Sequence, residues 1–265
     1  MIPEGERAPP KSLLEGVEAA ACAALGITNL KHRSALLYPE ALDAANVVDA
    51  VYRTLADNYA RGGASANKDR SQANWRWCSL QPQIAPHNRS PEVVLERAIA
   101  AACQKAGRTD WANQVPVASG LISGASDGRR AIDLVHRRGP RHFELIELKI
   151  ASDTPLYAAV EIIGYGCLWL LARADRPARA SDLLDADHID LRVLAPAAYY
   201  DRFDLESIEA SLDEQARALG DLQGVTLSFV FNVLPPSLSV VPMRSKVDPV
   251  IALKERHRLS RRSPS

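Results

Sequence analysis

The sequence predicts an α/β fold in which a mixed central β-sheet is flanked by helices, with a helical extension at the N-terminus. Segments with helical and strand periodicity follow in the order helix, strand, strand, strand, helix, strand, helix, strand. A hairpin-rich start followed by β-α-β units combines antiparallel and parallel pairs in one sheet. The composition agrees with a globular chain, because 265 residues with 47% hydrophobic and 24% charged residues suffice for one large domain.

Residues 1–85 are expected to form a helical region and a linker of unassigned role. Apolar residues recur at helical spacing over 12–25 and again over 41–60. The stretch 64–89 is polar, contains prolines and has no clear period, which is typical of a linker. We expect the two tryptophans at 75 and 77 to pack this linker onto a core, and stacking on a base or a partner is the alternative.

The expected main domain, residues 86–240, begins with a helix and three strands. Ser90 is a suitable N-cap and Pro91 a suitable first residue for a helix that stops at Gly107. Three strand candidates follow, at 112–118, 131–137 and 142–150. The sequence RGPR between the last two predicts a hairpin turn, so these strands should pair antiparallel.

The second half of this domain alternates helices and strands. Pro155 follows good capping residues and opens a long apolar helix that runs to about residue 174. The later elements are a strand, an amphipathic helix and a strand, at 189–196, 205–219 and 225–234. Asp204 is the expected cap of the amphipathic helix and Gly220 its expected stop. Residues 241–265 form a basic tail, which we expect to be solvated.

The cellular location is expected to be the cytoplasm, without a membrane partner. The N-terminus has no apolar signal-peptide core. The apolar run 156–172 contains Glu161 and two glycines, so it is better explained as a buried helix than as a membrane span. The four cysteines form no CxxC pair, and Cys22, Cys103 and Cys167 lie in apolar helical stretches as expected of small core residues.

The strand HFELIELKI ends in a carboxylate and an ammonium group. Side chains alternate across a strand, so Glu147 and Lys149 share one face with Phe143 and Leu145. Both faces of this strand are apolar up to the charged pair, as in a central strand. A surface ion pair at a strand end is the alternative, but the pair continues an apolar face.

Two further carboxylates stand out in apolar elements. Asp133 interrupts the strand AIDLV, where aspartate is disfavoured, and a solvent-facing position at the strand start is its alternative. Glu96 lies near Val93 and Ile99 on the apolar stripe of its helix, where a carboxylate is costly without a partner. Glu92 lies close to the same stripe, so either glutamate can be the inward one.

Together these residues suggest phosphodiester hydrolysis. Carboxylates on two hairpin strands can approach to about 5 Å. Hard divalent cations such as Mg²⁺ prefer carboxylate oxygens, and a bound metal activates water and neutralises charge on a phosphate. Lys149 could orient or deprotonate the water and stabilise the transition state. Alanine at Asp133, Glu147 or Lys149 should therefore abolish cleavage and leave the fold largely intact.

Three short stretches resemble the motif of the PD-(D/E)XK nuclease superfamily. They are LERAIA with Glu96, AIDLV with Asp133, and LIELKI with Glu147 and Lys149. This group includes type II restriction endonucleases, lambda-type exonucleases and archaeal Holliday-junction resolvases. The resemblance covers roughly residues 90–196. It implies a restriction-endonuclease-like fold and a hydrolase whose Mg²⁺ or Mn²⁺ is held by the aspartate and glutamates, while the lysine serves the water. No proline precedes Asp133, since AID stands where the pattern has PD.

A further likeness lies on the helix after the ExK strand, in the word EIIGY. Some exonuclease-like members carry Gln-x-x-x-Tyr at this place. Here Glu161 stands in place of the glutamine and Tyr165 matches the tyrosine. A spacing of four places both side chains on one helix face, where they are expected to support the site. A core position is the alternative for Tyr165.

The resemblance implies DNA as the partner. The formal net charge is zero, so positive charge for phosphates must be local. The residues expected to form a basic rim are Arg129, Arg130, Arg137, Arg138 and Arg141. The two-fold symmetry of DNA allows a homodimer, on which no sequence feature decides. The alternative function is a non-catalytic nucleic-acid-binding or assembly module that keeps the nuclease fold.

Overall fold

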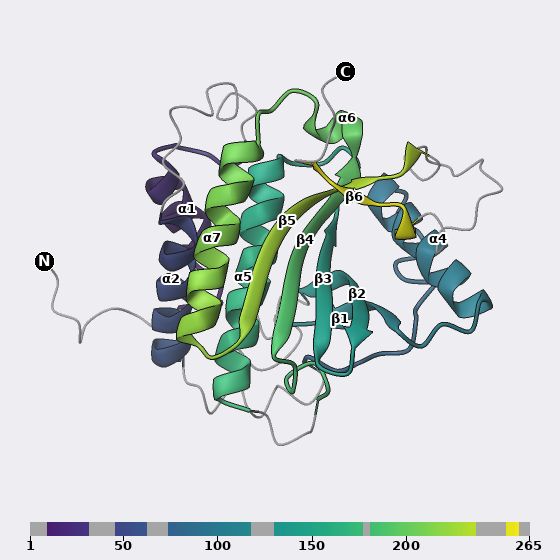
Figure 1. Cartoon of the computed structure of the whole chain (residues 1–265), viewed down its shortest axis with the longest axis horizontal. Coiled ribbons are helices and arrows are strands. Elements are labelled where there is room, and N and C mark those ends of the chain that lie inside the picture. Colours follow the sequence, from purple (N-terminus) through teal and green to yellow (C-terminus); the bar gives the residue numbers. More distant parts are fainter. Residues whose placement is uncertain are drawn as a thin grey trace, which may run out of the picture.

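Six strands form a mixed sheet in the computed structural model of the chain, which describes residues 10–31, 46–62, 74–117, 130–176, 181–236 and 253–259. The strands lie in sequence order: β1 (Trp111–Pro116), β2 (Ala131–Gly139), β3 (His142–Leu148), β4 (His188–Pro196), β5 (Thr226–Leu234) and β6 (His257–Arg258). β1, β2 and β3 are antiparallel, β3, β4 and β5 are parallel, and β6 is antiparallel to β5. The predicted mixed sheet is confirmed (Figure 1).

Helices cover the two faces of the sheet unequally (Figure 1). On one face lie α5 (Pro155–Ala174) and α7 (Glu206–Leu222), and these are packed against α1 (Val17–Leu25) and α2 (Val47–Gly62). On the other face lies α4 (Pro91–Lys105), beside β1, and a short helix α6 (Ala197–Tyr200) follows β4. One face therefore carries two layers of helices, while α4 covers only part of the other.

Strand β3 is buried on both faces, as expected of a central strand. Phe143 and Leu145 belong to the large core that α5 and α7 share with the sheet. Ile146 and Leu148 point the other way, into a smaller core with Leu95 of α4. Because side chains alternate across a strand, β3 contributes residues to two separate apolar cores.

Most helix ends follow the local signals in the sequence. The hydroxyl groups of Ser90 and Thr154 each accept a hydrogen bond from a first-turn N–H, at 3.4 and 3.2 Å. Gly26 ends α1 in the left-handed conformation, with a φ of 69°. The expected cap Asp204 lies one residue before the N-cap position of α7, which Leu205 occupies without a side-chain cap.

The bounds of α1 and α7 differ from the predicted ones for reasons that involve a glycine. α1 begins later than expected because Gly16 directly precedes it in a left-handed conformation, with a φ of 78°. α7 runs past the expected stop at Gly220 and ends at Leu222. A Cβ atom at Gly220 would lie 2.8 Å from the backbone nitrogen of Leu227. The glycine therefore serves the close approach of α7 to β5 rather than helix termination.

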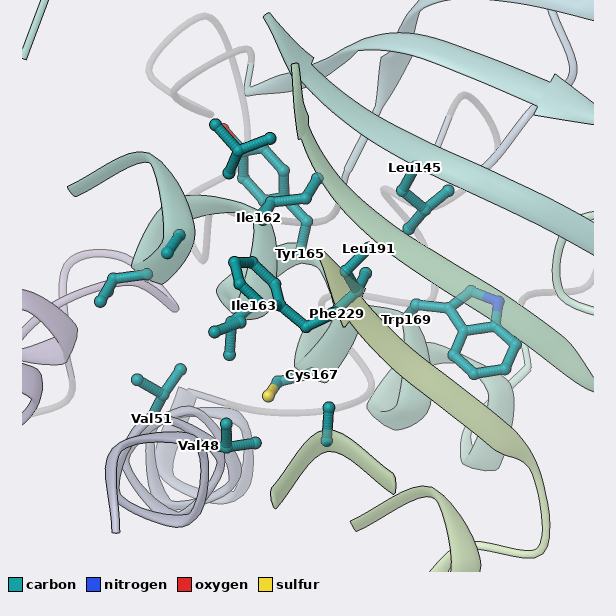
Figure 2. Close-up of a cluster of buried hydrophobic side chains, with 14 of the residues drawn as sticks. Val48, Val51, Leu145, Ile162, Ile163, Tyr165, Cys167, Trp169, Leu191 and Phe229 are labelled. Carbon is teal, nitrogen blue, oxygen red and sulfur yellow. The ribbon is translucent and has the colours of Figure 1, made fainter. Parts of the chain in front are cut away.

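The N-terminal helices share the large core with the sheet. Val48 and Val51 of α2 lie in one cluster with Ile163 and Cys167 of α5 (Figure 2). α5 is the described helix that is long and apolar enough to cross a membrane by length and composition, and 83% of its most apolar stretch is buried in protein.

The expected roles of the tryptophans and cysteines are confirmed as packing roles. Trp75 is buried, and the ring of Trp77 lies 5.7 Å from that of Phe143 between centroids. The thiols expected to be small core residues are buried, at Cys22, Cys103 and Cys167.

The expectation of a solvated C-terminal tail is wrong for residues 253–259. β6 pairs with the edge of β5, and Leu253 is fully buried in the smaller core. Arg256 forms an ion pair with Glu144, and Arg258 forms one with Glu209. Glu144 is buried on β3 and Glu209 is buried on α7. Because a buried carboxylate requires a cation or hydrogen bonds, these ion pairs hold the basic segment against the fold.

Candidate functional site

The hairpin of β2 and β3 brings Asp133 and Glu147 to one end of the sheet. The register pairs Leu134 with Ile146, so the next pair toward this end is Asp133 with Glu147. Oδ2 of Asp133 accepts a hydrogen bond from the backbone N–H of Leu148 at 2.9 Å. Asp133 is half-buried, and Glu147 is buried with 5% of its surface exposed. The two carboxylates are therefore held side by side by strand pairing.

Lys149 is shared between two carboxylates. Its Nζ lies 2.8 Å from Oε1 of Glu147 and 3.2 Å from Oε2 of Glu161 on α5. The other oxygen of Glu161 accepts hydrogen bonds from Arg130 at 3.0 Å and from the Tyr165 hydroxyl at 3.2 Å. Glu161 and Tyr165 thus contact the cluster through Lys149, as their place one turn apart on α5 allows.

Burial and mutual repulsion act on the two strand carboxylates. Burial raises the pKa of Asp133 to about 6, although the Leu148 N–H and Lys149 favour the charged form. Burial also raises the pKa of Glu147 well above its ordinary value, and the charges of Asp133 and Glu161 raise it further. Burial and repulsion therefore make both carboxyls harder to ionise than exposed ones.

Lys149 remains the cation of the cluster. Burial disfavours its ammonium form, but Glu147 and Glu161 outweigh this effect and raise the pKa of Lys149 above its ordinary value. The pKa of the Tyr165 hydroxyl is raised as well, by burial and by the charge of Glu161, so this group also stays protonated. Both groups are hydrogen-bond donors at neutral pH.

Glu96 is buried on α4 and is held by two amides of β1. Its Oε1 accepts a hydrogen bond from Nδ2 of Asn113 at 2.8 Å, and Nε2 of Gln114 lies 3.1 Å from both of its oxygens. Burial and the charge of Asp133 raise the pKa of Glu96 to about 8. Gln114 has a φ of 51°, a strained conformation for a residue with a side chain. Glu96 is therefore linked electrostatically to Asp133.

Glu92 contacts a different part of the chain from Glu96. Its Oε1 accepts backbone N–H bonds from residues 150, 151 and 152, at 3.1 to 3.2 Å, and the Ser152 hydroxyl at 2.9 Å. Although burial opposes ionisation, these hydrogen bonds lower the pKa of Glu92 to about 2. Glu92 thus fixes the loop that follows Lys149, and Glu96 is the inward glutamate of α4.

The arginines expected to form a basic rim are dispersed. Arg129 lies outside the described residues, and Arg130 lies in the cluster. Arg137, Arg138 and Arg141 lie at the turn end of the β2–β3 hairpin. At about 3.3 Å per residue, this places them about 13–20 Å along the strands from the carboxylates. These three residues therefore do not surround the site.

The oxygen donors of Asp133 and Glu147 fit a hard divalent cation in their chemistry. Burial, with a smaller contribution from neighbouring acidic charges, raises the pKa of both carboxyls, and a bound cation would favour their ionised forms. The positions of these carboxylate oxygens agree less well with a metal site than their chemistry does. Among the described residues, the group whose donor atoms lie within 4.8 Å of one another is His142, His188 and Asp190, not the acidic cluster.

Comparisons with known proteins were made for the whole chain. No family model, curated protein or solved structure matches it. The function must therefore be argued from the chemistry of the cluster itself.

Two site residues were missed in the sequence. Asn113 and Gln114 of β1 hold Glu96 through their side-chain amides. Two consecutive amides inside the word WANQVP were the available signal, because such groups require partners when buried.

We expect Glu96→Gln to change the pH dependence of stability. The folded chain keeps a proton on Glu96 up to a pKa of about 8, whereas the ordinary value is 4.5. The unfolded chain therefore binds fewer protons between these pH values, and Glu96 lowers stability as pH rises through this window. Urea unfolding in EDTA at pH 5 and pH 8 should show the variant gaining about 3–4 kcal/mol on the wild type.

Glu92→Gln is the matched control, on the same helix and with the opposite sign. The pKa of Glu92 is about 2, so its stabilisation is present above the ordinary value and is lost as pH falls toward 2. This variant should be less stable than the wild type at neutral pH. Parallel pH curves for wild type and Glu96→Gln would contradict the protonated state of Glu96.

Proposed function

We propose that this chain is a metal-dependent nuclease of the PD-(D/E)XK type, which hydrolyses phosphodiester bonds in DNA. The observation that carries the proposal is the joint placement of Asp133, Glu147 and Lys149 at one end of β2 and β3. Clustered acidic groups with raised pKa values beside a buried lysine are enriched at functional sites. The mixed sheet with helices on both faces agrees with a restriction-endonuclease-like fold.

The proposed roles follow from the charges of the side chains. Asp133 and Glu147 would hold Mg²⁺ or Mn²⁺, and Glu96 would support them from α4. When bound, the cation supplies activation of water and neutralisation of the phosphate charge. Lys149 stays protonated between Glu147 and Glu161, so it orients water and donates to the developing charge rather than acting as a base.

DNA as the substrate rests on the resemblance and on local charge. Arg130 lies at the cluster, and Nζ of Lys31 lies 4.4 Å from the ring centroid of Tyr157 on the same helix as Glu161. Lys31 is exposed and can approach a phosphate. A cytoplasmic homodimer that cuts DNA remains part of this proposal.

A second candidate is a non-catalytic nucleic-acid-binding or assembly module. One observation favours it. Lys149 already forms ion pairs with Glu147 and Glu161, so the cluster is partly neutralised without any metal ion. Metal binding and cleavage distinguish the two functions.

The test compares Asp133→Asn with a geometrically matched control. Oδ1 of Asp213 accepts the backbone N–H of Phe229 at 2.8 Å, just as Asp133 accepts that of Leu148 at 2.9 Å. Purified wild type, Asp133→Asn and Asp213→Asn are incubated with plasmid, linear and single-stranded DNA in Mg²⁺, Mn²⁺ or EDTA. We expect metal-dependent cutting by wild type and Asp213→Asn, and a loss of at least about 100-fold in Asp133→Asn.

Two results would count against the nuclease. Equal cutting by Asp133→Asn would show that the site is assigned wrongly. If no DNA form is cut and calorimetry detects no Mg²⁺ or Mn²⁺ binding that depends on Asp133, the binding module becomes the better function.

A further inference from the structure

A cavity of about 720 Å³ lies on the face of the sheet that α4 leaves partly open. Its walls come from β2, β3, β4, β5, α7 and the segment 253–258. Glu144 on β3 lines it and shares a face with Ile146 and Leu148. Glu147 and Lys149 point to the opposite face, so this cavity is separate from the acidic cluster.

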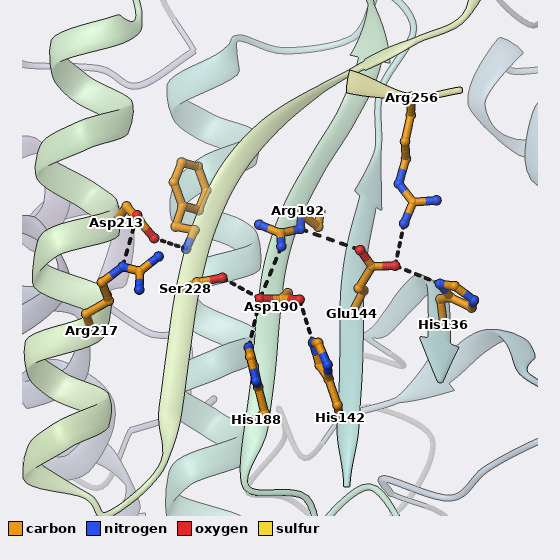
Figure 3. Close-up of polar contacts among 11 residues, drawn as sticks. His136, His142, Glu144, His188, Asp190, Arg192, Asp213, Arg217, Ser228 and Arg256 are labelled. Atoms are coloured by element: carbon orange, nitrogen blue, oxygen red, sulfur yellow. Dashed lines mark hydrogen bonds and ion pairs between the residues drawn. The ribbon is translucent and has the colours of Figure 1, made fainter. Parts of the chain in front are cut away.

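The floor of the cavity is a network of buried charges (Figure 3). Asp190 accepts from Ser228 at 2.5 Å and from His142 at 2.7 Å, and it lies 3.1 Å from Nη2 of Arg192. Glu144 binds His136 at 2.7 Å and forms an ion pair with Arg256. Burial opposes ionisation of Glu144, but His136 and Arg256 lower its pKa to about 2. Both carboxylates are therefore ionised, and each is already held by hydrogen bonds and ion pairs within the protein.

Basic side chains exceed acidic ones around this floor. The lining cations are Arg108, Arg138, Arg192, Arg217, Lys254, Arg256 and Arg258. Five of these seven have a carboxylate partner, on Asp110, Asp190, Asp213, Glu144 or Glu209. Within the described part of the chain, Arg138 and Lys254 are exposed and have no ion pair. The cavity thus keeps two cations available to a ligand.

An unsatisfied donor also points to a missing acceptor. Nη1 of Arg192 is buried and has no hydrogen-bond partner. A buried guanidinium N–H without an acceptor costs free energy, and such groups in native proteins usually bind water, an ion or a ligand. Arg192 lines the cavity, so an anion bound there would lie beside a guanidinium group that is not fully satisfied by the protein.

A metal ion fits this place poorly. The donor atoms of His142, His188 and Asp190 lie within 4.8 Å of one another, as for a metal site. However, the guanidinium of Arg192 lies 3.1 Å from the Asp190 carboxylate, and the cavity is lined by further cations. Like charges repel a divalent cation and attract an anion.

We propose that this cavity binds a small molecule that carries two or more linked phosphate groups. Arginine guanidinium groups bind phosphate oxygens through paired hydrogen bonds. The volume falls within the range of about 300–1,000 Å³ that holds small ligands. Arg138 lies on β2 and Arg258 on β6, and the two strands are four strand spacings apart, about 19 Å, so a ligand with linked phosphates spans these cations better than a single phosphate does.

The test uses the full-length protein, kept in EDTA so that metal-mediated binding at the acidic cluster is absent. Calorimetric titrations with tripolyphosphate, orthophosphate and sulfate are run at matched ionic strength. We expect tripolyphosphate to bind at least about tenfold more tightly than orthophosphate or sulfate, because it can span several arginines.

The decisive variant is Arg138→Ala combined with Lys254→Ala, two exposed changes that should leave the fold intact. Tripolyphosphate affinity should fall about tenfold or more. The control, Arg53→Ala with Arg202→Ala, removes the same charge from exposed positions outside the cavity and should bind like wild type.

Three outcomes would overturn the proposal. The first is no tripolyphosphate binding by the wild type. The second is equal weakening in both double variants, which would show a general charge effect. The third is tighter binding of a short DNA duplex that displaces tripolyphosphate, which would make this face a nucleic-acid surface instead.

Discussion

Glu147→Gln should abolish metal-dependent DNA cleavage and, in the metal-free protein, increase stability. Glu147 is buried, and its pKa is raised by burial and by the charges of Asp133 and Glu161. The glutamine keeps an oxygen for Lys149 but removes the negative charge that a metal ion requires. We expect a loss in cleavage rate of at least about 1,000-fold and a gain in unfolding free energy on the order of 1 kcal/mol.

The opposite signs of these two effects make the experiment informative. Cleavage is measured in Mg²⁺, and stability is measured by urea unfolding in EDTA at pH 7. Glu209→Gln is the matched control, because Glu209 is equally buried but accepts the N–H of Phe231 and pairs with Arg258, away from the cluster. That control should lose stability and keep its cleavage rate. A stable Glu147→Gln variant that still cuts DNA would refute the assigned site.

Lys149→Met should strongly destabilise the metal-free protein. Lys149 forms ion pairs with both Glu147 and Glu161, and its charge also acts on Asp133. Removal of one partner from a buried charge cluster leaves the others uncompensated, which typically costs about 3–5 kcal/mol. The structure thus changes the expectation, drawn from the sequence, that loss of Lys149 leaves the fold intact.

A double-mutant cycle measures this coupling directly. Lys149→Met, Glu147→Gln and the double variant are unfolded in urea with EDTA, and again with Mg²⁺. The double variant should recover part of the lost stability, because it removes one of the uncompensated carboxylates. Mg²⁺ should recover stability in Lys149→Met while Glu147 is present. Additive effects of the two substitutions would mean that the ion pair carries no coupling energy.

The stability and catalysis predictions have a common physical origin. The acidic cluster is buried, and burial raises the pKa of Glu96, Asp133 and Glu147. Functional sites of this kind lower the stability of the free protein. Variants that neutralise an acid should therefore stabilise the fold, whereas a variant that removes the lysine should not.

Local signals in the sequence determined most elements of the fold. Ser90 and Thr154 cap α4 and α5 through hydrogen bonds to first-turn N–H groups, which depend on a few adjacent residues. The turn sequence RGPR joins β2 to β3 as a hairpin, and side-chain alternation in β3 placed Glu147 and Lys149 on one face. These features follow from short-range geometry and can be read without knowledge of the rest of the chain.

Only the tertiary structure decided which charges meet. Both Glu92 and Glu96 lay near one helical stripe, yet one holds the loop after Lys149 and the other meets the amides of β1. Arg256 and Glu144 are 112 positions apart, and the pairing of β6 with β5 is also a contact that no local pattern encodes. The sequence by itself therefore determined the helices, the hairpin and the charged strand end, whereas long-range packing decided the ionic partners and the open basic cavity, because burial and electrostatics depend on contacts between distant segments.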